Sequence, residues 1–271
     1  MTGDTSDAFD SAERAMWTGR AGAYAGSFGR LCAHLVEPLL DAADVTAGTR
    51  LLDVGTGTGT AALAARLRGA RVVAVDADAG MVTAARGNGV DARLAVLPEL
   101  PFADGEFDVV VGNFVLNHVG RPRTALSELR RVLRPGGRLA VTTWSARRGA
   151  GQDLLGRACA EGGAVPPPYL PRLDPAEDFA RSAEGLAELL TEAGFIGAHA
   201  TELEWDHRAG LDEWWSGAVG GVATIGLVVT AQDAATVVRI RRAYERLAAG
   251  HADGEGRLAL PHVALLAVGT A

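Results

Sequence analysis

Short runs of apolar residues alternate with amphipathic stretches along the first half of the chain. The apolar runs are rich in Val, Leu and Ala and have the length of strands. The stretches between them repeat apolar residues every three or four positions, which is the period of a helix that packs on one side. Strands alternating with helices of this length predict a parallel sheet covered on both faces. The predicted strands are 50–54, 72–76, 92–96, 107–113 and 138–144, and the predicted helices are 60–68, 79–86 and 122–133.

The alternation stops after residue 144, where the chain becomes rich in Gly and Pro. Three prolines at 166–168 cannot continue a helix, so a loop is expected there. The pattern then resumes, and the later elements are predicted as a helix at 182–193, a strand at 195–205, a long amphipathic helix at 230–249 and a closing strand at 260–270. We therefore expect a single domain over 1–271, with insertions at about 145–182 and 206–250 that carry substrate specificity.

Composition and charge narrow the classes of partner. The net charge of −7 removes the overall basic field that would attract nucleic acid. Cys32 and Cys159 suggest no disulfide or zinc framework and fit a reducing cytoplasm. The acidic N-terminus does not look like a signal peptide, and the uncharged stretch 215–230 is shorter than the roughly 20 residues of a membrane span. A small-molecule substrate, no nucleic acid, no membrane span and a cytoplasmic location are expected.

Three glycines, Gly55, Gly57 and Gly59, separate the first predicted strand from its helix. Glycine permits positive φ and lets a ligand approach the backbone, and the helix N-terminus behind it offers free N–H groups. Asp76 ends the next strand, where a carboxylate can accept both hydroxyls of a ribose. A dinucleotide site would need glycine where Thr60 stands, so the spacing favours an S-adenosylmethionine site over a dinucleotide site. A simple tight turn is the alternative.

Four segments resemble, in order and spacing, the class I S-adenosylmethionine-dependent methyltransferases, and above all the small-molecule branch with ubiquinone and menaquinone methyltransferases. They read LLDVGTGTGTAALA, VVAVDADAGMVTAAR, LPFADGEFDVVVGNFVLNHV and ALSELRRVLRPGGRLAVTTW. The resemblance is specific over 10–145 and weaker beyond it. It implies an α/β, Rossmann-like fold with a seven-stranded, mostly parallel sheet, helices on both faces, the last strand antiparallel, and an N-terminal helical cap at about 8–30.

The resemblance also implies how the cofactor, S-adenosyl-L-methionine, is held. The glycine turn would cradle its methionine part, Asp53 would hold its ammonium group and Asp76 its ribose. Val96 stands where the family usually has an acid for the adenine amino group, and Glu99 is a candidate substitute. The implied cofactor-binding residues are Tyr24, Asp53, Gly55, Thr56, Gly57, Gly59, Asp76, Ala77, Met81, Leu97 and Asn113.

Methyl transfer from a sulfonium needs mainly alignment of the reacting atoms, so no catalytic triad is required. His118, just after the fourth strand, is a candidate base, and a packing histidine is its alternative reading. Tyr24 is the second catalytic candidate, because its ring can face a sulfonium. No spacing of His, Asp and Glu suggests a metal site. The expected acceptor contacts are Trp17, Phe28, Asn117, Trp144, Tyr169 and Trp215.

The sequence thus predicts an enzyme that transfers a methyl group from S-adenosyl-L-methionine by in-line displacement. The acceptor is expected to be a small, largely apolar metabolite, such as a polyketide, terpenoid or quinone from a biosynthetic pathway of secondary metabolism. Oxygen is the favoured acceptor atom, with carbon and nitrogen open. Two alternatives remain: the same fold recruited for a cofactor-assisted cyclisation or rearrangement, and a non-catalytic partner protein with a degenerate site.

Overall fold

A seven-stranded sheet forms the centre of the computed structural model, which describes residues 5–168, 170 and 172–271. Its strand order is β3-β2-β1-β4-β5-β7-β6. β7 is antiparallel to both of its neighbours, whereas the other pairings are parallel, so the predicted fold class is confirmed. The strands are β1 (Arg50–Val54), β2 (Arg71–Asp76), β3 (Ala92–Leu94), β4 (Phe107–Gly112), β5 (Leu133–Trp144), β6 (Ile196–Ala209) and β7 (Leu258–Thr270).

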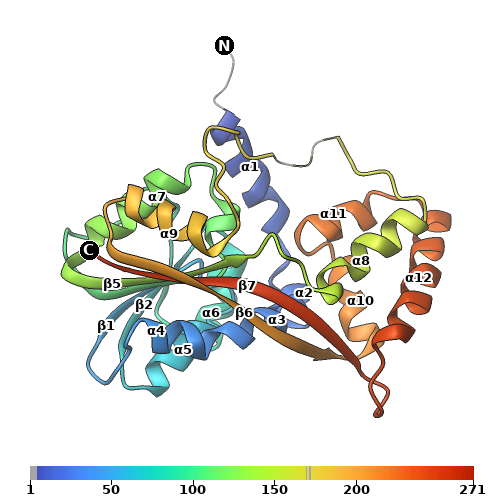
Figure 1. Ribbon diagram of the computed structural model, residues 1–271, viewed down its shortest axis with the longest axis horizontal. Helices are drawn as coiled ribbons and strands as arrows, with labels where there is room; N and C mark the ends of the chain where they lie inside the picture. The colour runs from blue at the N-terminus through green and yellow to red at the C-terminus, as the bar shows by residue number, and fades with distance from the viewer. Residues whose placement is uncertain (1–4, 169, 171) are drawn as a thin grey trace.

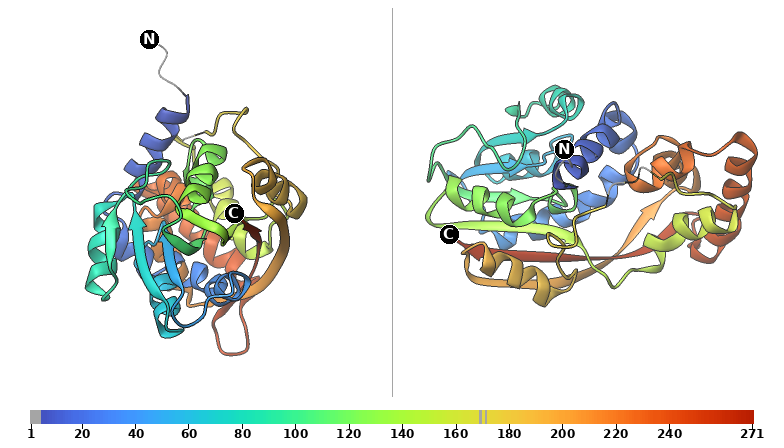
Figure 2. Two further views of the ribbon diagram at one scale, coloured as in Figure 1. Left: turned by 90° about the vertical axis from the view of Figure 1, so that its left-hand side faces the viewer. Right: turned by 90° about the horizontal axis from the view of Figure 1, so that it is seen from above.

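Helices cover both faces of this sheet, as Figures 1 and 2 show. α7 (Pro122–Val132) and α9 (Ala183–Glu192) lie on one face. α4 (Val36–Ala42), α5 (Thr60–Leu67) and α6 (Ala79–Gly87) lie on the other. In α5, α6, α7 and α9, which the sequence pattern predicted, the apolar stripe is the side that meets the strands.

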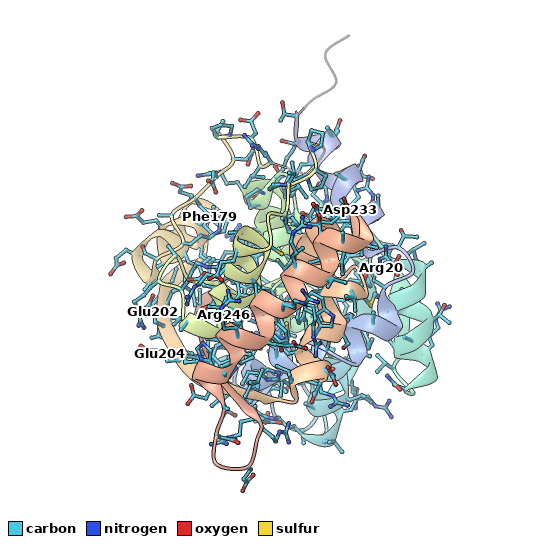
Figure 3. The ribbon with its side chains drawn as sticks, turned by 90° about the vertical axis from the view of Figure 1, so that its right-hand side faces the viewer. Arg20, Phe179, Glu202, Glu204, Asp233 and Arg246 are labelled. Atoms are coloured by element: carbon cyan, nitrogen blue, oxygen red, sulfur yellow. The ribbon has the colours of Figure 1, made fainter. Side chains whose placement is uncertain are left out.

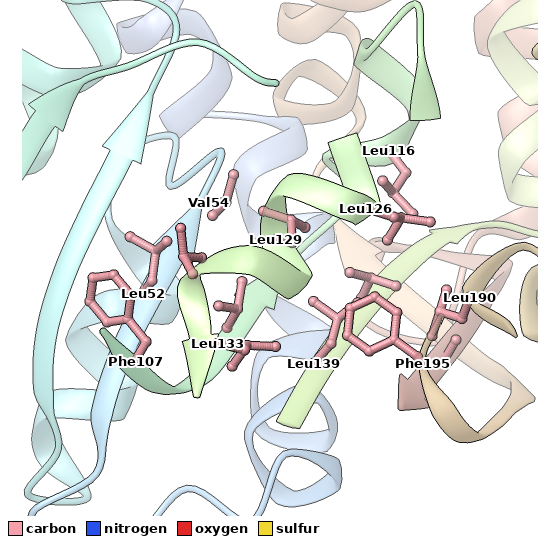
Figure 4. Packing of buried hydrophobic residues seen from close by; sticks show 14 of the residues in the cluster. Leu52, Val54, Phe107, Leu116, Leu126, Leu129, Leu133, Leu139, Leu190 and Phe195 are labelled. Atoms are coloured by element: carbon pink, nitrogen blue, oxygen red, sulfur yellow. The ribbon is translucent and has the colours of Figure 1, made fainter. Parts of the chain in front are cut away.

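The largest apolar cluster lies between the sheet and the helices α7 and α9 (Figure 4). Leu126 and Leu129 of α7 are fully buried there against strand residues such as Leu52 and Leu139. Burying one such side chain stabilises the fold by about 1.5–3 kcal/mol. This packing holds the carboxyl ends of β1, β2 and β4 in fixed positions.

β6 and β7 continue beyond the rest of the sheet as a two-stranded ribbon. Pairing between β5 and β7 ends at Trp144 and Ala264, whereas β6 and β7 stay paired as far as Ala209 and Leu258. The expected strand 195–205 is therefore longer than its apolar pattern indicated, because its far end packs on helices instead of on the sheet.

The ribbon carries a helical lobe with its own apolar core, at the right of Figure 1. Tyr244 is fully buried in this core, and the outer charged residues Asp233 and Arg246 face away from it in Figure 3. The Gly-rich stretch after residue 145, for which no helix was predicted, contains the first helix of the lobe, whose Leu154 and Leu155 fill the same core. The lobe helices are α8 (Ala150–Glu161), α10 (Leu211–Val219), α11 (Ala223–Thr230) and α12 (Ala234–Ala248), followed by the turn η3 (Ala249–His251).

The N-terminal helices lie between the sheet and the lobe, as the views of Figures 1 and 2 agree. Among the helices of the described residues, none combines the length and the apolar character needed to cross a membrane. The N-terminal elements are α1 (Thr5–Trp17), α2 (Ala21–Ala25), α3 (Phe28–Cys32) and η1 (Ala33–Leu35), and the short turn η2 (Leu116–His118) follows β4.

Candidate functional site

A cavity of about 680 Å³ lies where the carboxyl ends of the strands meet the N-terminal helices and the lobe. Its size is typical of a site for small molecules or cofactors. Strand ends such as Val54 and Val75, cap residues such as Trp17 and lobe residues such as Leu155 all line it. One cavity is therefore built from three parts of the chain that are far apart in sequence.

The glycine turn forms one end of this cavity. Gly55, Gly57 and Gly59 have φ of +67°, +55° and +92°, which side chains disfavour. A Cβ on Gly55 would lie 2.7 Å from a methyl carbon of Val115, and one on Gly57 would lie 3.3 Å from the Tyr24 ring. Gly55 and Gly57 line the cavity, while Gly59 begins α5 at its N-cap.

Asp76 lies beside this turn and lines the cavity. Its two carboxylate oxygens accept hydrogen bonds from the backbone N–H of Gly57 at 2.8 Å and of Asp78 at 2.9 Å. Burial raises the pKa of Asp76 above its usual value, and the two backbone hydrogen bonds oppose that shift. A half-buried carboxylate that lines the cavity fits a ligand that presents hydroxyls.

Asp53, the residue predicted to hold the ammonium group of the cofactor, is buried near the end of β1. It is 1% exposed and accepts a hydrogen bond from the Thr56 hydroxyl at 2.6 Å. Neither Asp53 nor Thr56 is among the residues that line the cavity. Burial raises the pKa of Asp53 to about 7. The hydrogen bond between Thr56 and Asp53 therefore stabilises the glycine turn on the side away from the cavity.

The expected adenine end is lined by Ala77, Met81, Leu97 and the unusual Val96. Glu99 borders a separate, smaller pocket rather than this cavity. Carboxylates reach the cavity from α1 instead, through Asp10 and Glu13. No sequence pattern pointed to these two acids, because only the fold brings α1 next to Val96.

His118 and Tyr24, the two catalytic candidates, both line the cavity and both have partners in the cap. Nδ1 of His118 lies 2.8 Å from a carboxylate oxygen of Glu13, and its ring meets Trp17 edge-on at 5.2 Å. Burial raises the pKa of Tyr24 well above its usual value, and a hydrogen bond with the Cys32 thiol contributes. Tyr24 is thus a neutral phenol at neutral pH, not a phenolate base.

Four of the expected acceptor contacts, Trp17, Phe28, Asn117 and Trp144, line the same cavity, as does Asn113. The amide of Asn113 bonds the Cys32 carbonyl and the Thr142 hydroxyl, and so joins the cap to β5. Tyr169 lies outside the described residues.

The placement of Trp215 on the cavity was wrong. Trp215 is buried in the lobe core, stacked on Tyr244 at 5.4 Å, and its neighbour Trp214 lines the cavity. Consecutive helical residues point in different directions, and the sequence alone did not show which of the two tryptophans faces the cavity.

Aromatic rings and histidines form the wall that continues from the cofactor end to the lobe. Phe114, at φ +60°, stacks on Trp144 at 4.2 Å. Trp205 lies 6.2 Å from Trp144 and 5.8 Å from His262. A non-glycine residue at positive φ is strained, and such strain is concentrated at functional sites.

Three histidines lie at the lobe end of this wall. His34 and His207 are joined by a hydrogen bond of 3.2 Å, and His262 lines the cavity. Burial lowers the pKa of His207 and of His262 to about 4, so both rings are neutral at neutral pH. Within the described residues, no group of three or more His, Cys, Asp or Glu side chains could hold a metal ion.

Comparisons with known proteins agree with this geometry. Residues 52–141, less than half of the chain, match the sequence profile of a family described as "Methyltransferase domain". A demethylmenaquinone methyltransferase from Clavibacter sepedonicus is 42% identical over 104 residues, which are 36% of this chain and 42% of that protein. The match thus spans less than half the length of that relative. These matches confirm the resemblance predicted from the motifs.

Two solved structures share the fold over most of the chain. The YcgJ protein from Bacillus subtilis covers 88% of this chain and 97% of its own, with a TM-score of 0.55 and 20% identity. The [4+2]-cyclase SpnF covers 88% of this chain and 80% of its own, with a TM-score of 0.53 and 22% identity. At these identities the likeness concerns the fold. With the glycine cradle and Asp76, the comparisons support S-adenosyl-L-methionine as the cofactor.

Proposed function

We propose, from the methyltransferase domain that residues 52–141 match, that this protein is an S-adenosylmethionine-dependent methyltransferase for a small, largely apolar acceptor. The observation that carries the proposal is the single cavity with the glycine turn and Asp76 at one end and an aromatic wall at the other. Group transfer requires two ligands held side by side, and this cavity offers two chemically different ends. Oxygen is the favoured acceptor atom.

The bound cofactor would supply a methyl group on a sulfonium, which needs no further activation. The backbone at Gly55 and Gly57 would hold the cofactor together with the Asp76 carboxylate. The rings of Trp17 and Tyr24 cover this end from the cap and exclude water. Positioning of this kind can lower a barrier by about 7–11 kcal/mol. His118, held by Glu13, is the base available to an acceptor that keeps its proton.

We further propose that the whole chain works as one cytoplasmic unit. The cap at about 8–30 covers the cofactor end, and the insertions at about 145–182 and 206–250 build the acceptor end. Free thiols at Cys32 and Cys159 fit a reducing compartment.

Cofactor binding is the first test. S-adenosylhomocysteine should raise the melting temperature, with a stabilisation of about 2.7 kcal/mol at 100 times Kd. NADH serves as the control and should give no shift, because Thr60 stands where a dinucleotide turn needs glycine. The absence of any shift at millimolar S-adenosylhomocysteine would favour the non-catalytic partner protein.

Product mass is the second test. A panel of hydroxylated apolar metabolites, incubated with protein and S-adenosylmethionine, should yield products heavier by one CH₂ unit. A product of unchanged mass that forms only when cofactor is bound would instead support a cyclisation or rearrangement. The fold shared with SpnF does not decide between these outcomes.

A further inference from the structure

His262 is a polar residue whose ring is surrounded by three tryptophan rings. It is 2% exposed and lies among the rings of Trp144, Trp205 and Trp214, whose centroids are 6.0, 5.8 and 5.5 Å from its own. Burying a polar ring in such surroundings is unfavourable unless its nitrogens find partners. The partners of the two ring nitrogens therefore indicate what the residue does.

One nitrogen of His262 has a partner that fixes the tautomer. Nδ1 lies 2.7 Å from the backbone carbonyl oxygen of Leu260. A carbonyl can only accept, so Nδ1 carries the proton and donates it. Burial lowers the pKa of His262 to about 4, and the nearby charge of Arg148 acts in the same direction. The ring is therefore neutral at neutral pH, and its Nε2 is left with a lone pair.

The other nitrogen has no protein partner. Within the part of the chain that the structure describes, no hydrogen bond reaches Nε2 of His262, although the side chain lines the cavity. The neighbouring histidine of β6, His207, bonds His34 and is not a lining residue. Of His207 and His262, only His262 therefore offers a ligand a free hydrogen-bond acceptor, its Nε2.

The surrounding rings select the shape of that ligand. Phe114 and Trp144 are stacked within 29° of parallel, and Phe28 lies 5.0 Å from Trp214. All four line the cavity. Flat aromatic walls favour a flat aromatic ligand, because offset stacking adds to the burial of its surface.

We propose that His262 is a specificity-determining residue that accepts a hydrogen bond from a hydroxyl group on a planar aromatic acceptor. The acceptor class is therefore a phenol or a fused-ring analogue of one, bound with its rings against Trp144 and Trp214 and its hydroxyl on Nε2. An aromatic compound of the same shape without a hydroxyl leaves Nε2 unpaired and binds more weakly. This inference rests on the proposed function for the identity of the site as an acceptor site.

The test compares two probes of nearly equal shape, 2-naphthol and 2-methylnaphthalene, by calorimetric titration. The ratio of their dissociation constants is measured for the native chain, for His262→Phe and for His207→Phe as the matched control. His262→Phe should lower the preference for 2-naphthol by about 2- to 12-fold, the range of one neutral hydrogen bond. His207→Phe should leave the preference unchanged. An unchanged preference in His262→Phe, or an equal loss in both variants, would overturn the proposal.

A second measurement needs no variant. In the native chain, the ¹⁵N signal of Nε2 of His262 should be that of an unprotonated nitrogen at neutral pH and should move with 2-naphthol but not with 2-methylnaphthalene. The same shift with both probes, or with neither, would contradict the inference. Both experiments are run with and without S-adenosylhomocysteine, whose own binding is scored separately. Failure of the cofactor to bind would therefore be distinguished from loss of hydroxyl selectivity.

Discussion

Asp53 and Asp76 end neighbouring parallel strands, yet their surroundings differ. Asp76 opens onto the cavity and accepts two backbone N–H groups, whereas Asp53 is sealed behind the turn with Thr56. We therefore expect Asp76 to contact the ligand and Asp53 to stabilise the glycine turn. Two predictions separate these roles.

Asp76→Ala should weaken binding of S-adenosylhomocysteine at least 10-fold, because a hydrogen bond to a charged group contributes about 1.5–3 kcal/mol. Titration calorimetry measures the loss, and circular dichroism checks that the fold is native. Asp91→Ala, at an exposed acid that directly precedes β3 and does not line the cavity, is the control and should bind normally. Native affinity in Asp76→Ala would mean that another group holds the ribose.

Asp53 should make the stability of the protein depend on pH. Because the folded-state pKa is about 7 and an unfolded Asp titrates near 3.9, the folded state binds the proton more tightly between these values. The free energy of unfolding contributed by this group therefore falls as pH rises from about 4 to about 7. Asp53→Asn should remove that part of the slope, as measured by urea unfolding at several pH values. Parallel curves for native and variant would refute the shift.

At the scale of the element, α1 is fastened to the turn after β4 by acidic side chains. Asp10 accepts a hydrogen bond from the backbone N–H of Gly120 at 2.6 Å, and Glu13 bonds His118 at 2.8 Å. Both contacts are partly buried, unlike the exposed ion pair of Asp7 with Arg121. The helix α1, which lines the cavity, is thus attached to the same turn that carries the candidate base.

Removing both buried contacts, by Asp10→Ala with Glu13→Ala, should increase hydrogen exchange across 5–17 and weaken cofactor binding. Asp7→Ala is the matched control, since an exposed ion pair contributes only about 0–1 kcal/mol. Hydrogen exchange measured by mass spectrometry of peptides reports on α1 separately from the rest of the chain. If the double variant exchanges at the native rate, apolar packing alone holds α1.

The two tryptophans of α10 allow a sharper comparison, because they are adjacent and face different surroundings. Trp215→Ala should destabilise the fold by about 3–5 kcal/mol, as expected for a large buried ring, with the rate per folded molecule unchanged. Trp214→Ala should also destabilise the fold, because Trp214 is buried in the same cluster, and should in addition raise KM for an aromatic acceptor with cofactor affinity intact, because Trp214 lines the cavity. Unfolding curves and steady-state rates measured on both variants distinguish the two effects. The opposite pattern would restore Trp215 to the acceptor site.

At the scale of the whole molecule, the sheet and the cofactor end could be predicted because their signals are local. The glycine turn, Asp76 and the strand–helix alternation each occupy a short window of sequence. The acceptor end could not be predicted in the same way. His262, Trp205 and Trp214 come from three separate elements: the pairing of β6 with β7 sets Trp205 opposite His262, and α10 places Trp214 against the His262 ring. The Gly-rich α8 was likewise missed, since its helix depends on packing within the lobe.

The ribbon of β6 and β7 bears on how such an enzyme changes its substrate over evolution. Inner positions of the ribbon, among them Trp205 and His262, meet in the aromatic wall, while Glu204 and Asp206 between the inner positions of β6 are exposed. Since side chains on a strand alternate between faces, inner positions can be exchanged singly without disturbing the backbone pairing. The glycine turn and Asp76 lie on other strands. Under the proposed function, new acceptors could thus be acquired by substitutions in the ribbon while the residues proposed to hold the methyl donor stay unchanged.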